Sequence, residues 1–290
     1  MILVVGGTGV LGRRLVEELD EAGERVRVLA RGVHPFPPEW SAAVERIAGD
    51  LRSEDECRRA VEGCDSVVLA ASGFGLAKDG DPRSVDRDGA IRVIRAAAAA
   101  GVGHVVMMSM HGAAPDAPID LLRCKYAAEE ALKTAGPAWT IIRMGILLEQ
   151  WLAQLRTSLD DKGTIMVFGT GEAPMTFTSV ADASAIIRRA LKDPALRGQT
   201  LEWGTEDHTA RELAAALITK AGRGTVRATP RVMLRVMSVA ARPFSPFVAR
   251  MAAAGTHMDS GAMRFDVAPA RRRFPDIAPH GLATALQETP

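Results

Sequence analysis

The stretch that decides the fold is Ile2-Leu3-Val4-Val5-Gly6-Gly7-Thr8-Gly9-Val10-Leu11-Gly12, near the start of a 290-residue chain. Four aliphatic residues are followed by a glycine-rich turn and then by a helical pattern over residues 11–22. A strand, a glycine loop and a helix in this order bring backbone N–H groups and the positive end of a helix dipole to one point. The stretch therefore predicts a binding site for the pyrophosphate of a dinucleotide.

The spacing of the glycines supports this interpretation. Gly7-x-Gly9-x-x-Gly12 matches the dinucleotide fingerprint, and Gly6-x-x-Gly9-x-x-Gly12 matches the wider spacing of short-chain dehydrogenases. The alternative, a plain turn between a strand and a helix, is disfavoured because the loop lies between a clear strand and a clear helix. The residues expected to contact the cofactor here are Gly6, Thr8, Gly9, Val10, Leu11 and Gly12.

The first 145 residues alternate short β-branched runs with longer helical ones, which is typical of a doubly wound parallel sheet. Strands are expected at 2–5, 25–30, 45–48, 66–71, 104–109 and 140–143, and helices at 11–22, 54–62, 85–100 and 120–135. We predict an α/β Rossmann core over residues 1–160, to which a strand and helix within 176–203 return. A smaller substrate-facing part is expected over residues 204–290.

The second half of the chain is less regular. Thr209 is expected to cap a helix that runs to Ala221. The apolar stretch 232–255 is interrupted by arginines and prolines, so it predicts broken helices and not a membrane span. Its large apolar residues would line a substrate pocket or, more simply, pack between helices; they are Met233, Met237, Phe244, Phe247 and Met251.

The composition favours small-molecule chemistry. Because 36 basic residues stand against 35 acidic ones, the net charge gives no reason to expect a nucleic acid or an anionic membrane as a partner. Three cysteines without metal-type spacing are typical of a reduced cytoplasmic protein, and no metal site is expected. A strand directly after Met1 leaves no room for a signal peptide. We expect a cytoplasmic protein with a small-molecule substrate, and a homodimer remains open.

The end of the second expected strand points to NADP(H). In dinucleotide-binding folds an acidic residue there binds the ribose 2′-hydroxyl, whereas an arginine accommodates a 2′-phosphate. No acidic residue lies between Glu24 and Glu39, and Arg31 occupies the deciding position, with Arg13 just after the last glycine. The alternative is that Arg31 is only a solvated strand end. We expect NADP(H), because NAD would lack its usual anchor.

Later motifs give a resemblance to a known family. The third strand ends in Gly49-Asp50-Leu51 and the fourth in Ala70-Ala71-Ser72, and a helix carries the pattern Lys125-x-x-x-Glu129. Thr140-x-x-Arg143 is followed by Met144, and Val180-x-Asp182 comes later. These elements resemble the atypical short-chain dehydrogenase/reductases, particularly the NmrA-like and isoflavone-reductase-like group, over about residues 1–220. Met144 departs from that family, which has a proline there.

The resemblance implies where the cofactor lies. Asp50 would approach the adenine, and Leu51 follows it at the same strand end. The small residues Ala70, Ala71 and Ser72 would line the cofactor. The Val180-x-Asp182 element would cap structure and take no part in the chemistry.

The tyrosine–lysine pair of many short-chain dehydrogenases is missing. Position 121 is leucine, and the only tyrosine, Tyr126, is adjacent to Lys125, so the two do not face each other on a helix. Lys125 would bind the nicotinamide ribose or donate a proton as in isoflavone-reductase-like relatives; alternatively it only pairs with Glu129. His111 would protonate the product and Ser109 would orient a carbonyl, unless they are a plain loop residue and a plain strand end.

These residues support a hypothesis with two rivals. The leading hypothesis is an NADPH-dependent reductase acting on a small, apolar carbonyl, quinone or conjugated substrate. One rival is a redox-silent NADP(H) sensor, since the resembled family includes regulators without the tyrosine. The other is a non-redox isomerase or dehydratase on the same fold.

Overall fold

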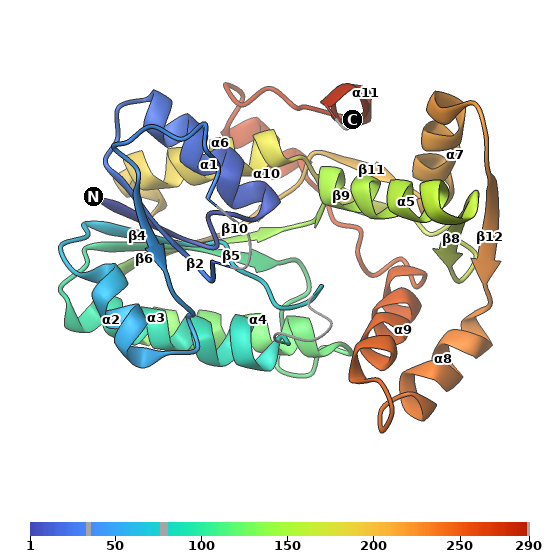
Figure 1. The fold of residues 1–290 in the computed structure, drawn as a ribbon, viewed down its shortest axis with the longest axis horizontal. Helices are drawn as coiled ribbons and strands as arrows, with labels where there is room; N and C mark the ends of the chain where they lie inside the picture. The colour runs from blue at the N-terminus through green and yellow to red at the C-terminus, as the bar shows by residue number, and fades with distance from the viewer. Residues whose placement is uncertain (33–35, 76–80, 289–290) are drawn as a thin grey trace. The chain divides into compact units, whose positions relative to one another are not determined.

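The computed structural model describes residues 1–32, 36–75 and 81–288 (Figure 1). The chain divides into two compact units. Unit 1 comprises Met1–Asp116, Asp120–Arg143 and Ala183–Glu202, and unit 2 comprises Ala117–Ile119, Met144–Asp182 and Trp203–Pro290. None of the described helices is long and apolar enough to cross a membrane.

Unit 1 is built on a seven-stranded sheet. In spatial order its strands are β10 (Gln199–Trp203), β6 (Ala138–Met144), β5 (His104–Met110), β4 (Ser66–Leu69), β1 (Ile2–Val5), β2 (Val26–Ala30) and β3 (Glu45–Ala48). The five strands β3, β2, β1, β4 and β5 pair in parallel. Because the chain moves outward from β1 in both directions, the strand order reverses between β1 and β4, where open α/β sheets bind their ligands. The predicted Rossmann fold is confirmed.

Helices cover both faces of this sheet (Figure 1). α1 (Val10–Glu21) and α6 (Val180–Lys192) lie on one face, and α2 (Glu54–Val61), α3 (Ala90–Ala99) and α4 (Asp120–Thr134) lie on the other. Alternate residues of each strand point to opposite faces, so the central strands β1 and β4 are apolar on both sides, whereas the edge strand β3 exposes Glu45 and Arg46. Leu3, Val67 and Val105 are among the fully buried residues that form the core with α2, α3 and α4.

Local details differ from the expected boundaries. The fourth strand ends at Leu69 and not at Ala71. The helix expected from residue 85 begins earlier, as a π-helical turn at Arg83–Gly89 that continues into α3. The sequence pattern did not indicate β10, which adds the last strand to the sheet beside β6.

Unit 2 contains two small sheets. One consists of β11 (Glu206–His208), β9 (Met175–Thr178) and β7 (Ile146–Leu147), and the other of β8 (Thr164–Phe168) and β12 (Thr225–Thr229). Its helices are α5 (Leu148–Lys162), α7 (Ala210–Ala221), α8 (Arg231–Ala240), α9 (Pro246–Met258), α10 (Ala268–Arg273) and α11 (Leu282–Glu288). Thr209 caps α7 as expected, in a reciprocal capping box with Glu212. The broken helices expected over 232–255 are α8 and α9.

Asp182 holds the C-terminal segment of unit 2 in place. Its fully buried carboxylate accepts hydrogen bonds from Thr205 Oγ1 (2.8 Å), from the backbone N of His280 (3.0 Å) and from Arg271. Burial alone would raise the pKa of Asp182, but the hydrogen bonds from the side chains of Arg271, His280 and Thr205, together with the charge of Arg271, hold the pKa below the ordinary value. The role is structural, as expected, yet Asp182 is not the helix cap, because Ser179 Oγ accepts from the Asp182 N–H (3.1 Å).

Candidate cofactor and reaction site

The glycine loop has the shape that a dinucleotide site requires. Gly6 has a φ of +87°, and a Cβ there would lie 2.8 Å from the backbone of Ala71. A Cβ on Gly12 would lie 2.2 Å from the carbonyl oxygen of Gly6. Gly9 differs, because its Cβ would meet only that same oxygen, at 3.3 Å. The fold requires glycine at positions 6 and 12, because a side chain there would clash with the backbone. At Gly9 the missing side chain instead leaves room for a ligand.

The N-terminus of α1 has the features of an anion-binding site. Gly9 occupies the N-cap and provides no side-chain cap, and the first turn contains no acidic residue. Gly9 and Val10 are exposed, Thr8 is half-buried and Leu11 is buried beneath the loop. Uncapped N–H groups at a helix N-terminus favour a phosphate group. The loop residues therefore fit the pyrophosphate of a dinucleotide.

Positive charge gathers at the ends of β2 and β3. Arg31 follows β2 directly, and Asp50 follows β3 after one residue. Burial would raise the pKa of Asp50, but its hydrogen bonds from Arg52 (2.6 Å to Nη2) and the charges of Arg52 and Arg31 lower it. The Arg31 guanidinium is thus close enough to act on Asp50. Arg13 is engaged elsewhere, in an ion pair with Glu39 at 2.6 Å.

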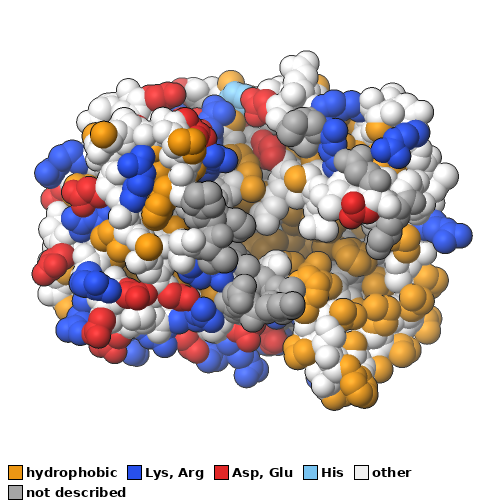
Figure 2. All heavy atoms as spheres, viewed as in Figure 1, with side chains coloured by type: hydrophobic (Ala, Val, Ile, Leu, Met, Phe, Trp, Pro, Cys, Tyr) orange, Lys and Arg blue, Asp and Glu red, His pale blue; other side chains and the backbone are white. Residues whose placement is uncertain are grey.

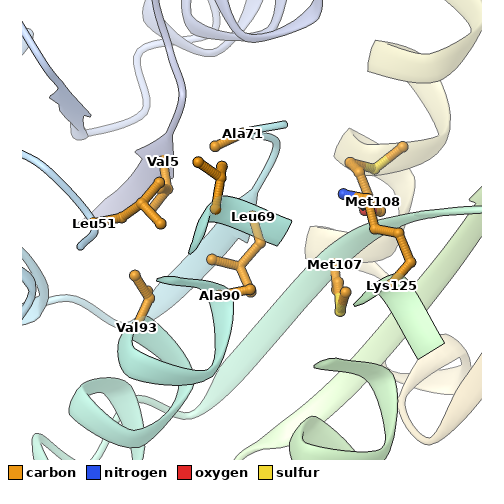
Figure 3. A pocket seen from close by; sticks show the side chains of 10 residues that line it. Val5, Leu51, Leu69, Ala71, Ala90, Val93, Met107, Met108 and Lys125 are labelled. Atoms are coloured by element: carbon orange, nitrogen blue, oxygen red, sulfur yellow. Dashed lines mark hydrogen bonds between the residues drawn. The ribbon is translucent and has the colours of Figure 1, made fainter. Parts of the chain in front are cut away.

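A small pocket opens at the carboxyl ends of β1, β4 and β5 (Figure 3). Val5, Leu69 and Met107 line it from the strands, and Leu51 and Ala71 line it from the loops after β3 and β4. Ala70 and Ala71 are half-buried and Ser72 is exposed. Among the described residues of the lining, Lys125 of α4 is the one that carries a charge. Of the expected cofactor residues, Leu51, Ala71 and Lys125 thus meet around one apolar pocket.

Lys125 is held between two acceptors. Its Nζ donates to the carbonyl oxygen of Met108 (3.0 Å) and lies 2.9 Å from Oδ1 of Asp86, a carboxylate that is fully buried. Asp86 also accepts from the backbone N–H of Gly73 at 2.8 Å, beyond the end of β4. Lys125 therefore pairs with Asp86 and not with its helical neighbour Glu129. Asp86 was not indicated by the sequence, because the π-helical turn that carries it has no motif of its own.

Ser109 belongs to a buried network that connects β5 to α4 and β6. Its hydroxyl donates to Glu129, which is fully buried and also accepts from Arg143 (3.0 Å from Nε and 2.6 Å from Nη2). This hydrogen bonding raises the pKa of Arg143. Ser109 itself is almost completely buried. Two of the motif residues, Glu129 and Arg143, thus bind each other, and the Ser109 hydroxyl is used within the same network.

His111 lies just beyond the end of β5 and is paired with a second glutamate. Its Nδ1 is 2.8 Å from Oε2 of Glu202, on β10, and the imidazole is about a quarter exposed. Glu202 Oε1 also lies 3.9 Å from Nη1 of Arg143. A carboxylate on one ring nitrogen orients an imidazole. The sequence did not single out Glu202, since it is 91 residues away from His111.

Comparison with known proteins agrees with this geometry. Residues 6–194 match the profile of a family described as NAD(P)H-binding. The chain belongs to this family. It is 31% identical over 224 residues to an NAD(P)H azoreductase of Xenophilus azovorans, a match that covers 77% of this chain and 74% of the relative. It is 32% identical over 228 residues, with the same coverage, to a (4-alkanoyl-5-oxo-2,5-dihydrofuran-3-yl)methyl phosphate reductase of Streptomyces griseus.

Solved structures share the fold of this NAD(P)H-binding protein. An NADPH-dependent quinone oxidoreductase of Escherichia coli, complexed with NADPH, has a TM-score of 0.76 at 21% identity and covers 99% of both chains. A triphenylmethane reductase of Citrobacter sp., complexed with NADP(H), has a TM-score of 0.75 at 19% identity and covers 100% of both chains. At these identities the likeness concerns the fold alone. Within the described part of the chain, no cluster of His, Cys, Asp and Glu is suited to hold a metal ion.

Proposed function

We propose that this protein is an NADPH-dependent reductase that acts on a small, apolar carbonyl, quinone or other conjugated substrate. The observation that carries the proposal is the location of the His111–Glu202 pair. It lies at the carboxyl end of β5, the same edge of the sheet that carries the glycine loop after β1. The relatives named as azoreductase and furanone-type reductase support the same class of reaction.

Each part of the site has one role in this proposal. When bound, NADPH supplies a hydride, so reduction of a quinone to a hydroquinone also needs a proton. The glycine loop binds the pyrophosphate, and Arg31 binds the 2′-phosphate, which selects NADPH over NADH. Lys125 binds the ribose next to the nicotinamide. His111, oriented by Glu202, donates the proton.

The ion pair of Lys125 favours binding over proton donation. If Lys125 gave up its proton, Asp86 would remain buried and charged without compensation, which costs several kcal/mol, about 3–5 when a buried pair is broken. His111 has no such constraint, since its partner Glu202 is partly exposed. The Ser109 hydroxyl donates to Glu129, so we propose that Ser109 positions this network and does not touch the substrate.

Oxidation of NADPH tests the proposal directly. The purified protein is mixed with NADPH and a panel that contains a quinone, an azo dye and a simple aldehyde, and the loss of NADPH absorbance is compared with the product formed. We expect one NADPH to be consumed per quinone reduced. Tight NADPH binding without oxidation in the whole panel would instead support the sensor, and product formation without NADPH consumption would support an isomerase or dehydratase.

We also propose that the protein works in the cytoplasm. All three cysteines are buried and unpaired, and burial raises the pKa of Cys57 and Cys124 to about 11. Such thiols are unreactive and suit a reducing compartment.

A further inference from the structure

Charge is distributed unevenly along this nearly neutral chain. Residues 213–258 contain seven of the 36 basic residues and none of the 35 acidic ones. This basic segment therefore carries a formal charge of +7. The rest of the chain carries −6, and the two together give the net charge of +1. The segment includes most of α7 and all of β12, α8 and α9 of unit 2. The net charge gave no reason to expect an anionic partner, but the charge of this segment does.

The same segment exposes hydrophobic side chains. Seven large hydrophobic residues are exposed in the described part of the chain, and five of them lie here: Val232, Met233, Val236, Val239 and Phe244. Each of the five is more than half exposed. We call them the apolar face. In Figure 2 hydrophobic side chains crowd the surface over α8 and α9.

The apolar face results from how α8 packs. The helix packs against α9 and buries Leu234, with Met237 and Ala241 half-buried near the same side. Val232, Val236 and Val239 have the spacing i, i+4, i+7 and form a second apolar row that points away from the buried one. An exposed apolar helix face of this kind marks a site that binds another apolar surface, such as a protein or a membrane.

Arginines border the apolar face. Arg231, Arg235 and Arg242 fall within about 40° of one another around the helix, between the buried row and the exposed row. Arg231 pairs with the buried carboxylate of Asp259. Arg235 and Arg242, like Arg227 on β12, are exposed and form no ion pair with any described residue. Their charges are therefore available to an external anion.

We propose that α8 docks its apolar face onto an anionic membrane surface. An interfacial helix inserts its apolar side at the level of the acyl chains while basic residues at its flank meet lipid phosphates. A second copy of this chain fits less well, because a two-fold contact through the apolar face would bring two arginine rows together without acidic partners. The proposal does not depend on the reductase activity, and it concerns surface attachment, not a span.

Vesicle sedimentation tests the proposal. The full chain is incubated with phosphatidylcholine vesicles and with vesicles that also contain phosphatidylglycerol, and the pelleted fraction is measured. We expect binding only to the anionic vesicles, with weaker binding as salt rises. Replacing both Arg235 and Arg242 by Gln should weaken binding by about ten- to thirty-fold. Replacing both Val236 and Val239 by Ser should weaken it by about ten-fold or more.

A matched control separates this surface from a general charge effect. The double variant R58Q/R59Q removes the same charge from exposed arginines of α2 and should bind vesicles as the unchanged protein does. All variants should keep their NADPH affinity, which shows that they fold. The proposal is overturned if the unchanged protein ignores anionic vesicles or if the α2 variant loses binding equally. It is also overturned if the valine variant turns a dimer into a monomer without any vesicle binding, or if the arginines bind only duplex DNA.

Discussion

The ammonium of Lys125 and the carboxylate of Asp86 form a buried ion pair, with Nζ 2.9 Å from Oδ1. Asp86 ties Lys125 to the loop after β4 through the Gly73 N–H, and Lys125 lines the pocket at the switch point of the sheet. The pair therefore connects three parts of unit 1 at the place where the cofactor is expected. Changes to either partner should affect cofactor binding and stability together.

Lys125→Met should weaken NADPH binding by about 10- to 100-fold, because a charge-assisted hydrogen bond of about 1.5–3 kcal/mol is lost. It should also destabilise the protein by about 3–5 kcal/mol, since Asp86 remains buried without a partner. Fluorescence titration and chemical denaturation measure the two effects. Adding Asp86→Asn to this variant should restore much of the stability but not the affinity. Unchanged affinity in Lys125→Met would remove the lysine from the cofactor site.

His111→Ala should lower turnover at saturating NADPH by about 10²–10⁴-fold, the usual loss for a missing general acid, and leave NADPH affinity unchanged. Glu202→Gln should cause a smaller loss, because the imidazole keeps its place but loses its charged partner. The pH dependence of kcat should change in both variants. Tyr126→Phe is the control, and loss of activity in that variant alone would show that the reacting groups have been assigned wrongly.

Arg31→Asp should reverse or abolish the preference for NADPH over NADH. The guanidinium is expected to bind the 2′-phosphate, whereas a carboxylate repels it and accepts from a free ribose hydroxyl. The dissociation constants of both cofactors are compared before and after the change. We expect NADPH binding to weaken by at least about ten-fold while NADH binding stays or improves. Equal affinities in the unchanged protein would contradict the predicted selectivity.

Gly9→Val and Gly12→Val should fail in different ways. A Cβ at Gly9 meets only the Gly6 oxygen at 3.3 Å, so Gly9→Val should leave the protein folded but abolish binding of both dinucleotides. A Cβ at Gly12 would lie 2.2 Å from that oxygen, so Gly12→Val should destabilise the fold itself. Circular dichroism and thermal melting distinguish the two outcomes. A folded Gly9→Val variant that binds NADPH normally would falsify the assignment of the loop.

Stability should fall as the pH drops from 6.5 toward 4, because burial lowers the pKa of His104 from 6.5 to about 4. In this range the unfolded chain binds a proton that the folded chain excludes. The contribution of His104 to the free energy of unfolding is therefore fully present above pH 6.5 and is lost progressively below it. The contribution is about 3 kcal/mol. Denaturant unfolding at a series of pH values measures it. His104→Gln, which can still bond to Thr140, should flatten the curve in this range.

The order of local patterns in the sequence was sufficient to predict the Rossmann core. Apolar runs, helical periodicity and glycine stops are local properties, so β1, α1, β3 and the cap at Thr209 were predicted to within a residue or two. The glycine loop was predictable for the same reason. Its phosphate site consists of backbone N–H groups of consecutive residues, so a local sequence pattern is enough to identify it. Sequence spacing also excluded the tyrosine–lysine pair, since it decides which helix residues face each other.

Only the tertiary structure decided which distant side chains meet. Asp86 reaches Lys125 across 39 positions of the chain, and Glu202 reaches His111 across 91, so no local pattern connects them. Tertiary packing likewise separated Lys125 from Glu129, although their spacing alone allows a helical ion pair. The outward direction of the apolar row on α8 was decided in the same way. A helix with two apolar rows is ambiguous in sequence, and only the packing of Leu234 against the interior determines which row remains exposed.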